Sequence, residues 1–137
     1  MTVIAVNPAG VHAVPAYSHA LVGTGTPVFL TGQIALDAEG RLVGVGDPAA
    51  QAAQVWRNIR SIVTALGADL TDIVKLTTFA VDRAHLPAIG AERARHFEPG
   101  RFPASTFLLV AGLAHPDYLV EIEVIVMLDD SAPAARS

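Results

Sequence analysis

The sequence of 137 residues contains no cysteine, which excludes disulfides and thiolate chemistry. No apolar run reaches the roughly 20 residues that a membrane-spanning helix needs, and no charged segment followed by a hydrophobic one marks a signal peptide. Histidine spacings typical of metal sites are absent, as are glycine-rich loops that open a helix around a phosphate. We therefore expect a cytoplasmic protein with no membrane partner, no metal ion and no other cofactor.

Charged residues make up only 16% of the chain, and the net charge is −4. The basic residues are scattered, and the densest group is Arg93, Arg95 and Arg101. Because a nucleic-acid-binding surface usually needs a basic patch, this charge argues against a nucleic-acid partner. Hydrophobic residues reach 52%, which is high for a soluble monomer. We expect the apolar surplus to cover an interface between copies of the chain.

The turn residues and apolar patterns predict a single α+β domain over residues 1–128, followed by a disordered polar tail at 129–137. The first part of the chain reads as a meander of short strands. Asp47 and Pro48 are suited to begin the longest helix, and Gly67 to end it. Its apolar residues recur at helical spacing and form one buried stripe, which comprises Ala52, Val55, Ile59, Ile62, Val63 and Leu66. We expect Gln51 to lie off this stripe and Trp56 to border it as a packing residue. The expected order is β-β-β-α-β-α-β-β, with two helices that cover only one face of a mixed sheet. The strands of this order lie within 1–16 and at 17–22, 28–35, 72–81, 105–112 and 119–128, and the helices at 48–66 and 84–97. A further short strand is expected at 41–45.

The last two predicted strands carry the first candidate site residues. Alternation places Val120, Ile122 and Val124 on one face of the final strand and Glu121 and Glu123 on the other. Carboxylates in a half-buried strand need partners or water, which makes this face the first place to look for a site. Strand 105–112 is apolar on both faces, so the uncovered face of the sheet should pack on another copy. We expect 105–112 and 119–128 to be adjacent and antiparallel, because the connection between them is short.

Several short segments of the chain form an ordered set. They are Pro15-Ala16-Tyr17-Ser18, Thr31-Gly32-Gln33-Ile34, Asp72-Ile73-Val74-Lys75 with Thr77-Thr78, Phe102-Pro103-Ala104 and Glu121-Ile122-Glu123. These segments resemble those of the Rid/YjgF family, in the family's order and nearly its spacing, and the match runs from about Pro15 to Leu128. The resemblance implies a homotrimer with a chorismate-mutase-like fold, and a hydrolase (imine deaminase) activity on reactive enamines and imines formed from amino acids.

The resemblance also implies a site in the clefts between subunits, where Tyr17, Gly32 and Glu121 match the family's residues. Ser105 stands where the family has an arginine that binds the substrate carboxylate, and a single hydroxyl carries no charge. We expect Arg101 either to swing toward the cleft or to remain a solvated loop charge. The other two departures are Phe107 at a cysteine position and Gly90 at an asparagine position.

Each matching residue has a structural alternative to its functional interpretation. Glu121 either activates a water or is a structural carboxylate bonded at the interface. Tyr17 either closes the cleft and donates a hydrogen bond or is an interface aromatic. Gly32 either offers its carbonyl or makes room for ligand, or it marks a strand bulge. Phe107 narrows the pocket and favours a more apolar ligand, and His19 is the histidine placed to reach the cleft.

Three classes of function follow from this sequence. The first is hydrolysis of an enamine, an imine or a related small metabolite by Glu121 and a water, with poor turnover of 2-iminopropanoate and 2-iminobutanoate because position 105 is a serine. The second is a non-catalytic trimer that binds a small ligand. The third is RNA cleavage, which the acidic net charge makes the weakest.

Overall fold

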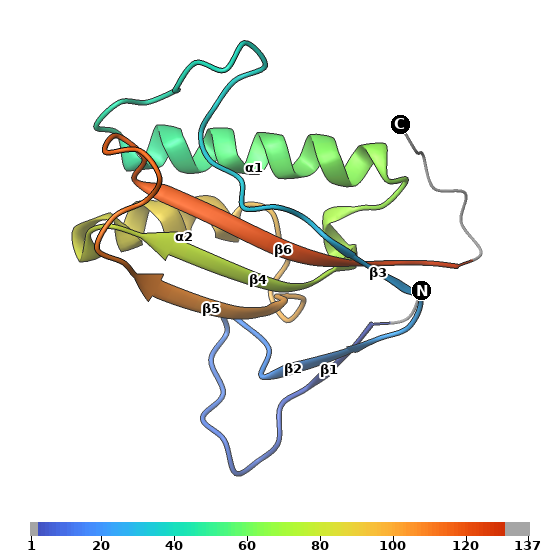
Figure 1. The fold of residues 1–137 in the computed structure, drawn as a ribbon. Coiled ribbons are helices and arrows are strands. Elements are labelled where there is room, and N and C mark those ends of the chain that lie inside the picture. Colours follow the sequence, from blue (N-terminus) through green and yellow to red (C-terminus); the bar gives the residue numbers. More distant parts are fainter. Residues whose placement is uncertain (1–2, 131–137) are drawn as a thin grey trace.

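The computed structural model describes residues 3–130 (Figure 1). Its order of strands and helices is the predicted β-β-β-α-β-α-β-β. Residues 131–137 of the predicted tail lie outside the described residues, and Asp130 accepts a hydrogen bond of 2.6 Å from the Thr26 hydroxyl. The elements are β1 (Val3–Val6), β2 (Ala20–Gly23), β3 (Thr26–Phe29), α1 (Pro48–Ala65), β4 (Ile73–Ala80), α2 (Leu86–Ala94), β5 (Ala104–Leu109) and β6 (Val120–Leu128), with short 3-10 turns at Leu70–Asp72 and Arg83–His85.

Four strands form a mixed sheet in the order β3-β6-β4-β5. β4 runs parallel to β5 and antiparallel to β6. The prediction that the last two strands are adjacent is therefore wrong, because β4 lies between them. β4 buries Ile73, Leu76, Thr78 and Ala80, which suits a central strand. Strands lie only about 4.8 Å apart, so the connection 110–119 easily crosses one of them.

The predicted meander at the start of the chain is also wrong. β1 and β2 pair with each other in a separate antiparallel two-stranded sheet, whereas β3 joins the larger sheet beside β6. Gly25 makes the turn between the two sheets, with a φ of 125° that favours glycine. The predicted strands 28–35 and 41–45 shrink to β3 and two isolated bridges, Gln33 with Ile122 and Leu36 with Leu42.

Helix α1 begins at the predicted Pro48 and ends at Ala65, one residue before the predicted end, with Leu66 as its C-cap. The Asp47 carboxylate accepts a hydrogen bond of 3.0 Å from the Ala50 N–H, and Pro48 occupies the first turn. At the other end, Gly67 has a φ of 76°, and its N–H donates to the Thr64 carbonyl at 3.0 Å. These local signals account for the helix bounds, and its apolar stripe faces the sheet.

Gln51 differs from the expectation that it lies off this stripe, because it is completely buried. Its side-chain amide donates to the carbonyls of Gly44 (3.0 Å) and Asp117 (2.9 Å) and accepts from the Leu119 N–H (2.9 Å). Buried polar groups are tolerated when they are bonded in this way. Gln51 therefore fixes the end of the connection that leads directly into β6 and Glu121.

Both helices lie on the same side of the four-stranded sheet (Figure 1). Their shared core includes the fully buried Trp56, Ile59 and Leu76. The opposite face of the sheet carries Phe29, which is 72% exposed, and Leu108, which is 42% exposed. Two apolar side chains on an open face favour packing against another surface.

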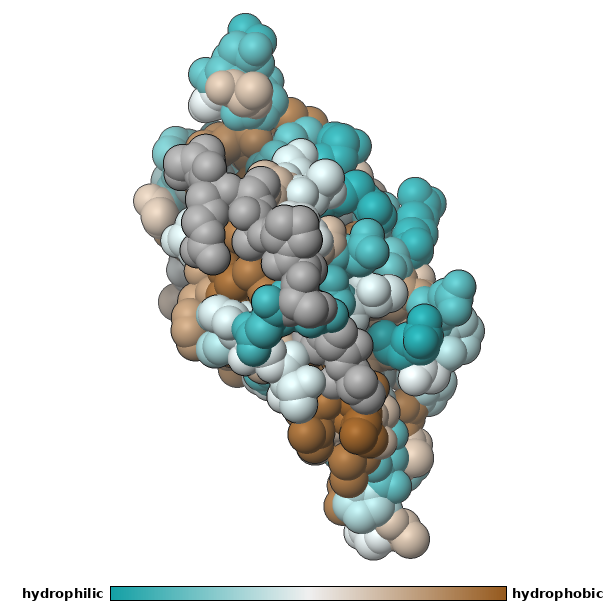
Figure 2. Space-filling model, turned by 90° about the vertical axis from the view of Figure 1, so that its right-hand side faces the viewer, coloured by the Kyte–Doolittle hydropathy of each residue, from teal (hydrophilic) through white to brown (hydrophobic). Residues whose placement is uncertain are grey.

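A second group of exposed apolar residues lies on the β1–β2 ribbon. The exposed residues of this ribbon are Ile4, Val6 and Val22. Figure 2 shows brown, apolar surface over the lower part of the molecule, where Figure 1 places the ribbon. Within residues 3–130, none of the helices is both long and apolar enough to cross a membrane.

Candidate functional site

Glu121 lies near the start of β6, on the sheet face away from the helices. It pairs with Phe79 of β4, while its neighbours Val120 and Ile122 are fully buried in the core. The alternation predicted for this strand is therefore confirmed. The register places a carboxylate on the face that the helices leave open.

Gly32 lies directly against the Glu121 carboxylate. A Cβ atom added to Gly32 would overlap Oε2 and would lie 2.8 Å from Cδ of Glu121. The neighbouring Gln33 holds this arrangement, because its N–H donates to the Ile122 carbonyl at 2.8 Å and its carbonyl accepts from the Ile122 N–H at 3.1 Å. Only glycine fits beside the carboxylate without displacing it.

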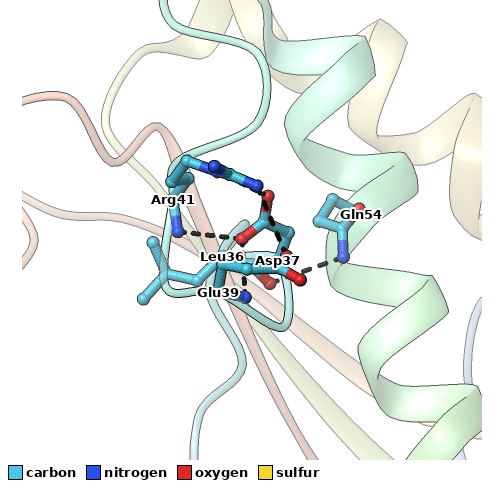
Figure 3. Close-up of polar contacts among 5 residues, drawn as sticks. All are labelled: Leu36, Asp37, Glu39, Arg41 and Gln54. Carbon is cyan, nitrogen blue, oxygen red and sulfur yellow. Dashed lines mark hydrogen bonds and ion pairs between the residues drawn. The ribbon is translucent and has the colours of Figure 1, made fainter.

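Helix α1 anchors the segment that contains Gly32. The Asn58 amide donates to the carbonyls of Ile34 (3.1 Å) and Leu36 (2.9 Å). The Gln54 amide reaches the same Leu36 carbonyl at 3.4 Å, as Figure 3 shows. Gly32 is therefore held between a β6 bridge on one side and a helix on the other.

The turn that follows closes on Asp37 (Figure 3). Its carboxylate accepts from the backbone N–H groups of Arg41 (2.9 Å) and Glu39 (3.0 Å). These bonds, the Arg41 N–H above all, hold the pKa of Asp37 below its ordinary value of 3.8. Asp37 is therefore a structural carboxylate that shapes the turn.

Tyr17 lies in the connection between β1 and β2, which projects away from the larger sheet (Figure 1). The next residue, Ser18, is buried and donates its hydroxyl to the Phe102 carbonyl at 2.8 Å and its N–H to the Pro103 carbonyl at 3.4 Å. Tyr17 is thereby held beside the segment that leads into β5. Ser18 was not among the residues that the sequence singled out, although it belongs to the matching Pro-Ala-Tyr-Ser segment.

His19 supports this connection from within. Its ring meets the Tyr17 ring edge-on at 5.4 Å between centroids. Its Nε2 atom lies 2.6 Å from the His12 carbonyl oxygen. His19 therefore braces the loop and orients the ring of Tyr17.

Ser105 and Phe107 lie on the other face of the sheet from Glu121. In the parallel β4–β5 register they pair with Leu76 and Thr78, whose side chains are buried on the helix side. The sheet itself therefore lies between the Ser105 and Phe107 side chains and the Glu121 side chain. One chain therefore does not bring Ser105 and Phe107 together with Glu121.

The Ser105 hydroxyl accepts a hydrogen bond of 3.2 Å from Nη1 of Arg93, which lies on α2. Arg93 is half-buried, and burial lowers the pKa of its guanidinium. Gly90 lies three residues earlier, one helical turn away on the same side of α2. A Cβ atom added to Gly90 would have no atom within 4 Å, so the space beside it is open.

In the sequence, Arg93 stands out only as one of three nearby arginines, and Arg101 was the residue expected to supply a positive charge to the site. Arg101 is exposed, and it lines a separate cleft together with Ser18 and Asp72. The helical spacing of Gly90 and Arg93 was the one signal in the sequence that pointed to Arg93.

The histidines of the described chain serve other purposes. Among residues 3–130, no three His, Cys, Asp or Glu side chains are grouped to hold a metal ion. The His96 ring stacks on Trp56 with centroids 4.9 Å apart, and its Nε2 atom lies 3.3 Å from Glu92. Burial lowers the pKa of His96, an effect that its bond to Glu92 opposes. Trp56 is a packing residue, as predicted.

Comparison with known proteins agrees with this architecture. Residues 8–128 match the family described as Endoribonuclease L-PSP. A RutC family protein of Synechocystis sp. is 33% identical over 113 residues, which are 82% of this chain and 85% of that protein.

Solved structures show the same relationship. The crystal structure of YyfB of Yersinia pestis, a protein of unknown function in the conserved Rid family, has a TM-score of 0.86 and 35% identity, covering 93% of this chain and all of that one. The structure of RidA from the Antarctic bacterium Psychrobacter sp. has a TM-score of 0.68 and 33% identity, covering 85% of this chain and 92% of that one. The chain belongs to the Rid/YjgF family, and its fold is the family's α+β, chorismate-mutase-like fold.

Proposed function

We propose that this protein hydrolyses an enamine, an imine or a related small metabolite, with Glu121 as the group that positions and activates a water. The observation that carries this proposal is the Glu121 carboxylate held against Gly32. Within residues 3–130, no hydrogen-bond donor or cation of the chain occupies that carboxylate. An unpaired carboxylate next to a backbone that leaves room for it is suited to bind a water or a protonated nitrogen.

The chemistry requires a group that can take up and return a proton. An enamine first gains a proton at carbon and becomes an iminium. Water then adds to the C=N carbon while the Glu121 carboxylate accepts the water's proton. The same carboxyl returns the proton to nitrogen, the C–N bond breaks as the hydroxyl proton passes to solvent, and a carbonyl compound and ammonia leave. The released hydroxyl proton balances the one that the enamine carbon took up from solvent. Glu121 is regenerated, so neither an oxidant nor a reductant is needed.

We propose that the complete site forms between copies of the chain. Glu121 and Gly32 lie on one face of the sheet, and Ser105 and Phe107 lie on the other. A small ligand reaches both sets only if a second copy contributes one of them. The exposed Phe29 and Leu108 on the open face support such an association, and the family resemblance suggests a trimer.

The residues at positions 105 and 107 bear on the substrate. A serine at position 105 supplies no charge of its own, so we expect 2-iminopropanoate and 2-iminobutanoate to be poor substrates. Phe107 packs against the core and presents an apolar wall. We propose a larger, more apolar substrate than these small imino acids, with Tyr17 contributing a hydrogen bond at the mouth of the site.

Ammonia release tests the proposed activity. Imines are generated in situ from a panel of amino acids with small, branched and aromatic side chains, and ammonia is measured with and without the protein. The proposal predicts an accelerated release that is largest for the apolar members. Binding of these compounds without acceleration would instead support a non-catalytic, ligand-binding trimer.

Light scattering tests the assembly. The proposal predicts a mass three times that of the 14.3 kDa chain. A monomer at micromolar concentration would contradict a site shared between copies.

The family description raises RNA cleavage as a second candidate. The net charge of −4 and the scattered basic residues argue against it, since RNA binding depends on neutralising phosphates. Steep salt-dependent binding of a single-stranded RNA would favour this candidate over hydrolysis of imines.

A further inference from the structure

We propose that Arg93 and Ser105 together form an anion site that binds the carboxylate of the substrate. The proposal deepens the function above, and it rests on that function only for the identity of the ligand. The guanidinium comes from helix α2 and the hydroxyl from strand β5, so neither element carries the site alone.

Arg93 is a half-buried charge without a charged partner in the described chain. Within residues 3–130, no carboxylate pairs with Arg93, and its Nε atom is buried without an acceptor. Arg95, the residue that caps the C-terminal end of α2, shows the usual arrangement, with a side chain that is 76% exposed and an ion pair of 3.4 Å to Glu92. An arginine stays charged in proteins, and a desolvated charge without a partner is costly. A bound anion removes that cost.

Arg93 and Ser105 both keep hydrogen-bond donors for a ligand. The Ser105 oxygen accepts from Nη1 of Arg93 at 3.2 Å, which leaves the hydroxyl proton free to donate. The guanidinium keeps further N–H groups in a planar fork that matches the two oxygens of a carboxylate. Two different groups therefore converge on one planar anion.

The space beside Gly90 on α2 is open. Gly90 lies one helical turn before Arg93, on the same side of the helix. Apart from the helix's own backbone, no atom lies within 4 Å of the position that a Gly90 side chain would begin to fill. This side of α2 therefore leaves room for a ligand near the turn that carries Arg93.

The position of the cation also defines the ligand. An arginine at residue 105 would carry its charge out from the strand by the length of its side chain, whereas the Arg93 guanidinium lies at the hydroxyl of Ser105. The carboxylate therefore sits close to β5, and the rest of the ligand passes Phe107 on the same face. This geometry selects carboxylates with an apolar body, such as an aromatic 2-imino acid, over those with three or four carbons.

Binding of a product-like acid tests the proposal without any turnover. The probes are 2-oxo-3-phenylpropanoate and its uncharged amide, titrated calorimetrically into the natural protein, Arg93→Met and the matched control Arg95→Met. We expect Arg93→Met to bind the acid about 10- to 100-fold more weakly, because charge-assisted hydrogen bonds are lost. Arg95→Met should keep its affinity for the acid, and the amide should bind all three proteins equally weakly.

Two further measurements separate this proposal from its alternatives. Arg93→Met should unfold at or above the temperature of the natural protein, because an unpaired buried charge has been removed. A lower unfolding temperature with loss of the oligomer would show a structural role and overturn the proposal, as would equal binding of acid and amide or unchanged affinity in Arg93→Met. Glu121→Gln should still bind the acid, so a failure of the hydrolysis proposal remains distinguishable from a failure of this one.

Discussion

The substitution Gly32→Ala tests whether the position of the Glu121 carboxylate matters. The added methyl group would overlap Oε2 and lie 2.8 Å from Cδ and 3.1 Å from Cγ of Glu121. These atoms are at the end of a flexible side chain, so the carboxylate moves while the backbone and its Gln33–Ile122 bridge remain. The structure therefore predicts a local displacement of one functional group.

The expected magnitudes follow from this geometry. Overpacking typically costs about 1–3 kcal/mol, and a flexible neighbour places this site near the lower end of that range. A displacement of a reacting group by about 1 Å can reduce a rate roughly 10²-fold. We expect Gly32→Ala to lose most of its rate of ammonia release while its free energy of unfolding falls by only about 1 kcal/mol.

The assay compares ammonia release and urea denaturation for Gly32→Ala and a control, Gly112→Ala. Gly112 has no atom within 4 Å of an added Cβ, so its substitution should change neither measurement. A rate of ammonia release in Gly32→Ala equal to that of the natural protein would contradict this prediction, because it would show that hydrolysis does not depend on where this carboxylate lies.

Two other predictions concern stability. Gln51→Leu leaves the Leu119 N–H and two carbonyls without their buried partner. We therefore expect the free energy of unfolding, measured by urea denaturation, to fall by about 2–4 kcal/mol. A fall of less than about 0.5 kcal/mol would show that water replaces the amide. Because burial lowers the pKa of His96 from 6.5, the unfolded chain takes up this proton first as the pH falls, and stability is lost below about pH 6.5. In His96→Phe, the free energy of unfolding should depend less on pH in this range than it does in the natural protein. An identical pH dependence in both proteins would contradict the role given to His96.

The parts of the fold that depend on local signals were predictable from the sequence. Asp47 and Gly67 define α1, because a cap and a left-handed glycine act on residues next to them. Alternation along β6 predicted that Glu121 lies on one face of the strand and that the core residues Val120 and Ile122 lie on the other face. In both cases the determining interactions lie within one element or on one face of it.

Strand order and the Arg93 contact depend on residues far apart, and the sequence did not predict them. β4 lies between β5 and β6 because its alternate residues are buried against the helices, a fact that no turn or short connection reveals. Gln51 is buried because its partners are Asp117 and Leu119, 66 and 68 residues away. Arg93 of α2 meets Ser105 of β5 through a side-chain hydrogen bond across 12 residues of sequence.

The measurement that tests the central claim most directly is ammonia release by Glu121→Gln, with Glu123→Gln as its control. Both carboxylates lie on the same face of β6, and only Glu121 is held against Gly32. General acid–base groups contribute about 10²- to 10⁴-fold, so Glu121→Gln should lose a factor in that range while its oligomer stays intact. Glu123→Gln should retain the natural rate within about a factor of three, since the three atoms nearest to Gly32 all belong to Glu121 and none to Glu123. A rate of ammonia release in Glu121→Gln equal to that of the natural protein would contradict the proposed role of Glu121 and show that this carboxylate is structural.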